Sequence, residues 1–241
     1  LRMFDHFGYS IINNNQKIVE LNNEHKNLIN ITNSISMTPK IRRYNLIQAL
    51  EYIKFNNLDG DLVECGIWKG GNIVIYKKFL EANNMKRKIY AFDTFEGMSS
   101  PSQNDYTIHE KIDAKTLLEN DKKKITNDWG VCSLEDVKMN ISQHTENLND
   151  IFFIKGKVEV TLLNQKNIPE KISILRLDTD FYESTKIELE ILYERVCEGG
   201  VIVIDDYGHW AGSRKAVDEF FKNKFVWMHY VDYACRLIIK K

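Results

Sequence analysis

The chain has 241 residues, of which 43% are hydrophobic, enough for one large α/β domain with a sizeable buried core. Its 33 lysines and arginines nearly balance its 34 aspartates and glutamates, so the net charge of −1 gives no argument for binding nucleic acid or an anionic membrane. No apolar stretch approaches the roughly 20 residues of a membrane-spanning helix, and the first residues lack a signal-peptide core.

The four cysteines are widely spaced, at positions Cys65, Cys132, Cys197 and Cys235. They form no C-x-x-C pair and no cysteine and histidine pattern of a zinc site. Because disulfides are rare in the cytoplasm, we expect reduced thiols and a cytoplasmic protein.

Residues 1–36 are rich in asparagine and weakly periodic, so we expect an N-terminal appendage, partly helical, that serves as a lid or an oligomer contact. From Thr38 and Pro39 onward, apolar residues recur at helical spacing, and proline is favoured in the first turn of a helix. The pattern predicts a helix that ends near Asn56. The main domain is then residues 37–241.

After this helix, short apolar segments alternate with longer amphipathic ones. The short segments predict strands over 61–65, 88–92, 151–154, 172–177, 201–205, 225–230 and 235–239. The longer segments predict helices over 72–82, 183–196 and 213–222. Such alternation is typical of an α/β fold with a doubly wound, mostly parallel sheet and helices on both faces. The last two strands predict an antiparallel edge at the C-terminal end.

The stretch 98–150 departs from this alternation. Residues 98–106 are loop-like, and 111–124 predict a charged helix with a poor apolar stripe. Ser133-Leu-Glu-Asp136 fits a capping box at the start of a helix that runs to about Gln143. We expect the stretch to be an insertion over the sheet edge, on the substrate side.

The first predicted strand runs into Glu64-Cys-Gly-Ile-Trp-Lys-Gly-Gly71 and then into a helix. Glycines at such a turn let the backbone bend tightly and approach a ligand beside a helix N-terminus. The spacing differs from G-x-G-x-x-G. It suits an adenosyl sulfonium cofactor, which has no pyrophosphate and whose cationic amino-acid end can meet an acidic residue. The alternative is a glycine-rich turn of purely structural use.

The second predicted strand ends in Ala91-Phe-Asp-Thr-Phe-Glu-Gly97. Asp93 lies at the tip of this strand, at the interval after a glycine turn at which an acid reaches a ribose diol. Taken singly, Asp93 could as easily cap the next loop. The two motifs in order favour the ribose.

Three carboxylates follow two further apolar strands: Asp178 comes after 172–177, and Asp205 and Asp206 come after 200–204. Neighbouring parallel strands lie roughly 4.8 Å apart, so the acids converge where open α/β sheets bind ligands. Adjacent carboxylates repel each other unless a cation intervenes. Oxygen-only ligands predict Mg²⁺, with Mn²⁺ or Ca²⁺ as alternatives. The structural alternative is a set of helix caps.

His209 follows these acids closely enough to act as a general base or to contact a substrate, although most loop histidines do neither. Arg214 and Lys215 fit a helix face or a substrate contact better than catalysis. Asp180 is expected to cap the helix that follows it.

Taken together and in order, four segments resemble the macrocin O-methyltransferase (TylF-type) family. They are residues 64–71, 92–97, 175–185 and 204–220, within a match over 37–222. The resemblance implies a Rossmann-like class I methyltransferase fold. It also implies an S-adenosylmethionine- and Mg²⁺-dependent O-methyltransferase that acts on a sugar hydroxyl.

The resemblance also assigns roles to residues. Those matched to the methionine end of the cofactor are Glu64, Gly66, Gly70 and Gly71. Those matched to its ribose and adenine are Asp93, Thr94, Phe95 and Gly97. Those matched to the metal are Asp178, Asp205 and Asp206. Asp178 is also the expected proton acceptor, with His209 as the other catalytic candidate. Residues 37–43 resemble the stretch that folds over the cofactor.

The chain departs from the family pattern after Phe153-Ile-Lys-Gly156, where Val158-Glu-Val-Thr-Leu162 replaces a proline-containing stretch. Selectivity for the acceptor is expected to be set by 1–36 and 98–150. The composition, rich in Asn, Ile and Lys, suggests an AT-rich bacterium. The expected acceptor is a surface polysaccharide, a glycolipid or a natural-product glycan, and a homo-oligomer is expected.

Two other functions compete with this one. A catechol-type O-methyltransferase uses a similar metal and fold on an aromatic diol, but residues 205–210 favour the sugar branch. A non-catalytic cofactor-binding protein is the second rival. The presence of every carboxylate that the chemistry requires argues against it.

Overall fold

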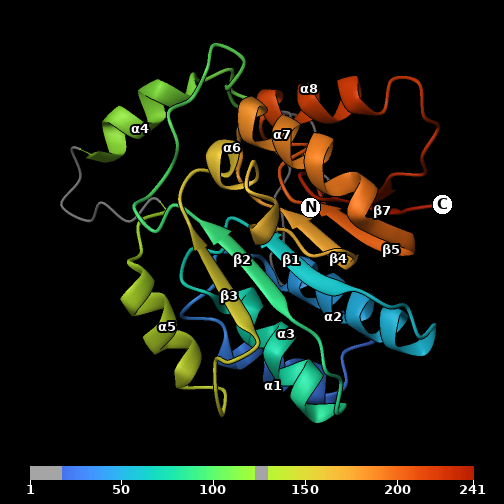
Figure 1. Ribbon diagram of the computed structural model, residues 1–241. Helices are drawn as coiled ribbons and strands as arrows, with labels where there is room; N and C mark the ends of the chain where they lie inside the picture. Colours follow the sequence, from blue (N-terminus) through green and yellow to red (C-terminus); the bar gives the residue numbers. More distant parts are fainter. Residues whose placement is uncertain (1–17, 123–129) are drawn as a thin grey trace, which may run out of the picture.

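The computed structural model describes residues 18–122 and 130–241, so the expectations for residues 1–17 and 123–124 fall outside the described chain. Seven strands of the described chain form one sheet in the order β3-β2-β1-β4-β5-β7-β6 (Figure 1). The strands are β1 (Asp61–Cys65), β2 (Ile89–Asp93), β3 (Ile151–Lys155), β4 (Ile172–Leu177), β5 (Val196–Ile204), β6 (His229–Tyr230) and β7 (Arg236–Ile239). β1 to β5 are parallel, and β7 is antiparallel to both neighbours.

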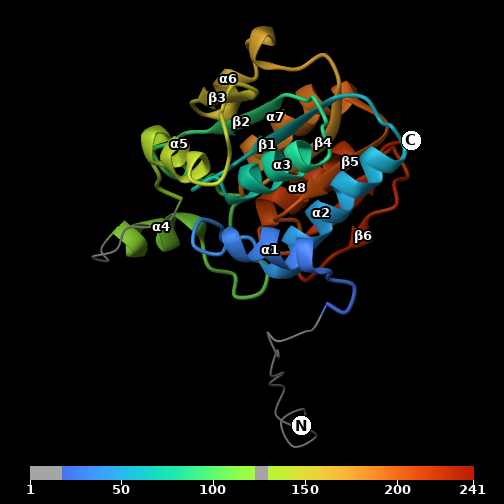
Figure 2. The same cartoon turned by 90° about the horizontal axis from the view of Figure 1, so that it is seen from below.

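Helices cover both faces of this sheet, as predicted (Figures 1 and 2). One face carries α1 (Asn23–Ile31), α2 (Lys40–Phe55), α3 (Gly71–Ala82) and α5 (Leu134–Ser142). The other carries α6 (Val158–Thr161), α7 (Tyr182–Leu192) and α8 (Ala211–Phe220). α4 (Ala114–Lys122) stands to one side and packs Leu117 and Leu118 near Phe181 and Trp210.

The register of the parallel strands brings their carboxyl ends to a single edge. Cys65 at the end of β1 pairs with Phe92 of β2 and with Leu177 of β4, and Leu177 pairs with Ile204 of β5. These strands are apolar because both of their faces are covered by helices. The residues that follow them therefore share the edge at which α/β sheets bind ligands.

Most predicted elements are confirmed, with shifted ends. α2 begins at Lys40, because Pro39 is the residue before the helix rather than a residue inside its first turn. The predicted helix 183–196 ends at Leu192 and tightens into a 3-10 turn, and Val196 already belongs to β5. Only His229–Tyr230 of the predicted strand 225–230 pairs with β7.

The two segments expected to set selectivity lie on different parts of the fold. The described part of 1–36 contains α1, which is capped by Asn22 and packs on the α2 face. Within 98–150, α5 begins at the predicted cap Ser133 and packs into the same core. The loop before α4 crosses to the opposite side, where the backbone N–H of Ile108 donates to the carbonyl of His209 at 2.8 Å.

No helix of the described chain combines the length and the apolar character needed to cross a membrane. The four cysteines are buried free thiols.

Candidate functional site

The turn after β1 requires glycines because its backbone lies against other segments. Gly66 has a φ of +84°, and a Cβ atom there would lie 1.9 Å from the carbonyl oxygen of Asp178. A Cβ atom on Gly71 would lie 2.5 Å from the Cβ of Ser36. The turn is therefore held between the end of β4 and the segment that precedes α2.

Asp93 braces this turn from the end of β2. Its Oδ2 accepts the backbone N–H groups of Ile67 and Trp68 at 2.9 and 3.0 Å, and its Oδ1 accepts that of Phe95 at 2.8 Å. Burial raises the pKa of Asp93, and these three hydrogen bonds, with a longer one from the Thr94 hydroxyl at 3.5 Å, oppose the increase. A carboxylate has about four lone-pair positions. The Thr94 hydroxyl lies closer to the carbonyl oxygen of Gly97, at 2.5 Å, so the fourth position of Asp93 is open to a better placed donor, such as a ligand hydroxyl.

A cavity of about 230 Å³ lies between this turn and the ends of β4 and β5. The predicted site residues in its lining are Gly66, Asp93, Thr94, Gly97, Asp178 and Asp205. Residues 37–43, expected to fold over the cofactor, contribute Met37, Thr38 and Arg42. The lining residues that the sequence did not single out include Trp68, Met98, Val158, Thr179 and Ser184.

The other predicted site residues do not line this cavity. The side chain of Phe95 is buried in the core, edge-on to Phe153 with ring centroids 6.4 Å apart. Glu64 lies within β1 and is only 1% exposed. Gly70 and Gly71 lie where α3 begins. Asp206 and His209 also lie outside the lining.

Arg176 is the centre of the charged group beneath the cavity. It lies near the carboxyl end of β4, is 2% exposed, and contacts three carboxylates. Its NH1 lies 2.7 Å from both Glu64 Oε1 and Asp178 Oδ2, and its NH2 lies 2.6 Å from Asp205 Oδ1. Buried Glu64 and Asp205 and partly exposed Asp178 thus share one guanidinium.

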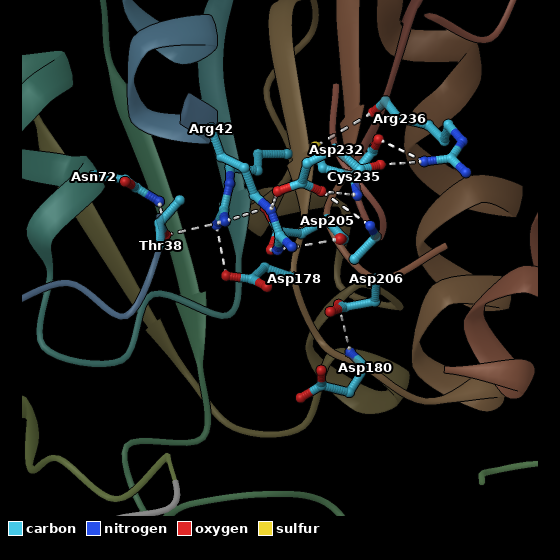
Figure 3. Close-up of polar contacts among 12 residues, drawn as sticks. Thr38, Arg42, Asn72, Asp178, Asp180, Asp205, Asp206, Asp232, Cys235 and Arg236 are labelled. Atoms are coloured by element: carbon cyan, nitrogen blue, oxygen red, sulfur yellow. Dashed lines mark hydrogen bonds and ion pairs between the residues drawn. The ribbon is translucent and has the colours of Figure 1, made fainter. Parts of the chain in front are cut away.

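A second arginine reaches Asp205 from α2 (Figure 3). Arg42 NH1 lies 2.5 Å from Asp205 Oδ2. Burial alone would raise the pKa of Asp205, but the two arginines hold it below the ordinary value. The cation expected among these acids is supplied in part by arginine, because Arg176 contacts Asp178 and Asp205 and Arg42 contacts Asp205.

Asp206 and Asp180 lack such a partner in the described chain. The backbone N–H of Asp180 donates to Asp206 Oδ2 at 3.2 Å, and Figure 3 shows this pair apart from Arg42. Burial raises the pKa of Asp180 to about 6, and burial with the carboxylates of Asp180 and Asp178 raises that of Asp206 well above its usual range. The helix-cap role expected of Asp180 was wrong, since Phe181 precedes α7.

The three predicted metal ligands do come together. One carboxylate oxygen each from Asp178, Asp205 and Asp206 can be chosen so that all three lie within 4.8 Å of one another. These are hard oxygen donors of the kind that Mg²⁺, Mn²⁺ and Ca²⁺ bind. The residues present therefore fit a divalent cation by donor type and by convergence.

His209 lies outside the lining of this cavity. Its ring packs edge-on against Trp210 and Tyr233, with centroids 5.1 and 6.0 Å away. Burial lowers the pKa of His209, so its neutral form is favoured at pH 7. The backbone N–H of His209 donates to the carbonyl of Asp206 at 3.0 Å, so His209 is near the acids without lining the cavity.

Sequence reasoning gave no role in the site to Arg176 or Asp180, and it included Arg42 only as part of the stretch 37–43. A signal for Arg176 was present, since an arginine in an otherwise apolar buried strand is rarely left without partners. Asp180 could have been noticed from its place two residues after Asp178. Arg42 gave no comparable signal, because its partners lie 163 and 190 residues away.

Comparisons with known proteins identify the family and the fold. A sequence model of the macrocin O-methyltransferase (TylF) family matches residues 11–236. Demethyldecarbamoylnovobiocin O-methyltransferase of Streptomyces niveus is 30% identical over 180 residues, which cover 74% of this chain and 64% of that relative. 8-Demethyl-8-(2,3-dimethoxy-alpha-L-rhamnosyl)-tetracenomycin-C 4'-O-methyltransferase of Streptomyces olivaceus is 29% identical over 179 residues, covering 73% and 63%. Both matches span less than two thirds of the relative.

The solved structure of the O-methyltransferase NovP superposes with a TM-score of 0.75 and 27% sequence identity, over 86% of this chain and 82% of that one. The expected Rossmann-like class I fold is thereby confirmed. With a family match over nearly the whole chain, the protein belongs to the macrocin O-methyltransferase (TylF) family.

Proposed function

We propose that this protein is an S-adenosylmethionine-dependent O-methyltransferase that methylates a sugar hydroxyl. The observation that carries the proposal is the single cavity lined by both the glycine turn and the carboxylate edge. A methyl donor held at the first would present its methyl group to a hydroxyl held at the second. Membership of the family supports the same reaction.

The cofactor half of the cavity suits the donor chemically. Asp93 has capacity for a ribose hydroxyl, and the apolar side chains of Met98 and Val158 offer contacts for an adenine ring. Glu64, buried behind the turn, adds negative charge where a cationic amino-acid end is expected. We assign the methionine end to the turn at Gly66 and the adenosyl end to the loop from Asp93 to Gly97.

A divalent cation, with Mg²⁺ favoured, would be held by Asp178, Asp205 and Asp206. When bound, it would lower the pKa of the acceptor hydroxyl and help to orient it. Of the three ligands, Asp206 is the one whose carboxylate forms no salt bridge with an arginine or lysine of the described chain, so it has most to gain from a cation. Asp178 and Asp205 already contact Arg176 and would need to share that charge.

Three residues compete for the role of proton acceptor. Asp178 Oδ2 is engaged by Arg176 at 2.7 Å, and His209 lies outside the cavity lining. Asp180 lines the cavity and forms no salt bridge in the described chain. We therefore prefer Asp180 to the two residues predicted from sequence.

The reaction is an in-line displacement at a methyl carbon. The acceptor oxygen forms a bond to that carbon while the carbon–sulfur bond breaks, S-adenosylhomocysteine leaves, and the hydroxyl proton passes to a carboxylate. The leaving group is already good, so the protein's contribution is orientation and proton removal. The cavity walls at Gly66 and Asp180 would set the approach of the two substrates.

The relatives suggest the class of acceptor. The name of the tetracenomycin enzyme specifies a rhamnosyl 4'-hydroxyl, which supports a glycoside as the substrate here. A natural-product glycan, a surface polysaccharide or a glycolipid would each present such a hydroxyl. We also propose that the protein forms a homo-oligomer and acts in the cytoplasm, where its four free thiols would stay reduced.

The test is calorimetric titration of S-adenosylmethionine into the wild type, Asp93→Ala and Asp178→Asn, followed by turnover assays on rhamnosides and catechols with Mg²⁺ or excess EDTA. We expect micromolar binding by the wild type, loss in Asp93→Ala, and binding without turnover in Asp178→Asn. EDTA should abolish turnover and leave cofactor binding intact.

Asp150→Asn is the matched control, because Asp150 also pairs with a buried cation, Lys77, but precedes β3 at the opposite edge of the sheet. A folded wild type that binds no S-adenosylmethionine would remove the methyltransferase assignment. Full turnover in EDTA would remove the metal, and turnover of catechols alone would favour the catechol-type rival.

A further inference from the structure

The side chain of Arg42 forms a bridge between Asp205 and Asp232, and so joins α2 to β5 and to the C-terminal hairpin. Arg42 lies in the first turn of α2, and its side chain is 8% exposed. Its Nε lies 2.7 Å from Asp232 Oδ2 in the turn between β6 and β7, and its NH1 lies 2.5 Å from Asp205 Oδ2 after β5. Figure 3 shows Arg42 together with these two aspartates. The guanidinium of Arg42 also lies 5.7 Å from the ring centre of Tyr233.

The Asp232 end of this bridge is itself fixed. Asp232 Oδ1 accepts the backbone N–H groups of Ala234 and Cys235 at 2.9 and 2.8 Å. The carbonyl oxygen of Asp232 accepts from Arg236 NH1 at 2.9 Å. The remaining oxygen, Oδ2, is therefore directed at Arg42 by a turn that cannot rotate freely.

At its other end, the bridge determines how Asp205 is held. Arg176 takes Asp205 Oδ1, but it also contacts Glu64 and Asp178 and does not contact Oδ2. Arg42 takes Oδ2, so two arginines from different elements fix both oxygens and hence the plane of the carboxylate. Each oxygen keeps a second lone pair for a further ligand.

We propose that Arg42 is a positioning residue, which orients Asp205 as a metal ligand by anchoring it to the turn at Asp232. The inference rests on the metal site of the proposed function and adds a structural requirement to it. α2 and the C-terminal hairpin must both be docked before Asp205 is oriented. Groups that orient metal ligands in this way commonly change metal affinity about 10- to 100-fold.

Asp232→Asn tests the bridge without altering a residue of the cavity lining. The amide oxygen of asparagine can keep the two turn hydrogen bonds, while its NH₂ group replaces the acceptor that faces Arg42. Arg42→Gln removes the bridge from its other end. Asp150→Asn serves again as the control for replacing an ion-paired aspartate.

The measurement is Mn²⁺ affinity by electron paramagnetic resonance, with thermal unfolding and S-adenosylmethionine titration on the same samples. Both bridge variants should bind Mn²⁺ about tenfold or more weakly than the wild type and the control. Cofactor affinity should stay within about threefold in Asp232→Asn, because Asp232 lies outside the cavity lining, whereas Arg42 is part of it. The double variant should bind Mn²⁺ only slightly more weakly than each single variant, because both substitutions remove the same interaction.

Unchanged or tighter Mn²⁺ binding in both variants would overturn the positioning role, and tighter binding would identify Arg42 as a competitor of the metal. Weaker Mn²⁺ binding in Arg42→Gln but not in Asp232→Asn would show that Asp232 does not anchor Arg42. A wild type that binds no Mn²⁺ would overturn the metal site and this inference with it. Wild-type binding with unaffected variants would overturn the inference only.

Discussion

The two halves of the cavity are built from different interactions. On the β1 and β2 side, the turn at Gly66 and the carboxylate of Asp93 meet backbone groups of nearby segments. On the β4 and β5 side, carboxylates meet the side chains of Arg176 and Arg42. An added side-chain atom destabilises a turn whose backbone is closely packed, whereas a lost charge destabilises a cluster of ion pairs. We therefore expect the stability of the first half to depend on side-chain volume and that of the second half on side-chain charge.

Arg176→Met should have the largest effect on stability. It keeps an unbranched side chain but leaves Glu64, Asp178 and Asp205 without their shared cation in a buried site. Breaking a buried ion pair from one side costs about 3–5 kcal/mol. Urea unfolding followed by circular dichroism measures this loss.

Arg195→Met is the control for this experiment, because the guanidinium of Arg195 donates to Gln165 in an exposed position. Its cost should stay within about 0.5 kcal/mol, as for other surface changes. If Arg176→Met were no more harmful than this control, charge would not be what holds the β4 and β5 half together.

Gly66→Ala should cause the next largest loss of stability, and it tests the β1 and β2 half of the cavity. The added methyl group would collide with the carbonyl of Asp178, and the φ of +84° adds strain. Gly199→Ala is the matched control, because its φ of +77° is similar but its nearest neighbour is the Leu58 side chain at 3.3 Å. Strain alone costs about 1 kcal/mol or more, so Gly66→Ala should exceed the control by roughly 2 kcal/mol. Equal losses in urea unfolding would show that backbone contact at the turn is unimportant.

The same division explains what the sequence could predict. The turn at Gly66 and the strand ends at Asp93, Asp178 and Asp205 follow from local patterns, since apolar segments and glycines are contiguous in sequence. Convergence of the acids followed from parallel pairing alone. The partners of those acids did not, because Arg42 comes from a helix 163 residues before Asp205. Pairing across such distances depends on the docking of whole elements, which no local pattern encodes.

The carboxylate of Glu188 lies in a third kind of environment, with neither the backbone donors of Asp93 nor the arginine partners of Asp205. It is fully buried in α7 and accepts from the Thr179 hydroxyl at 3.0 Å, and in the described chain it has no salt bridge. Burial raises the pKa of Glu188 well above its ordinary value. Unlike Asp180, it does not line the cavity. The raised pKa favours the protonated form of Glu188, which needs no counter-charge.

Glu188→Gln should show the smallest effect, visible as a change in pH dependence. Between the ordinary pKa of glutamate and the raised folded-state pKa, the folded protein binds one proton more than the unfolded chain at this site. Stability from this site is thus greatest at low pH and falls as the pH rises, by at most about 1.4 kcal/mol per pH unit. Glutamine does not titrate, so the variant should gain on the wild type from pH 5 to pH 8 in urea unfolding. A constant difference across that range would mean that Glu188 is ionised when folded. Protonation would then not account for the missing counter-charge of Glu188, and Glu188 would resemble Asp206 and Asp180, of which only Asp180 lines the cavity.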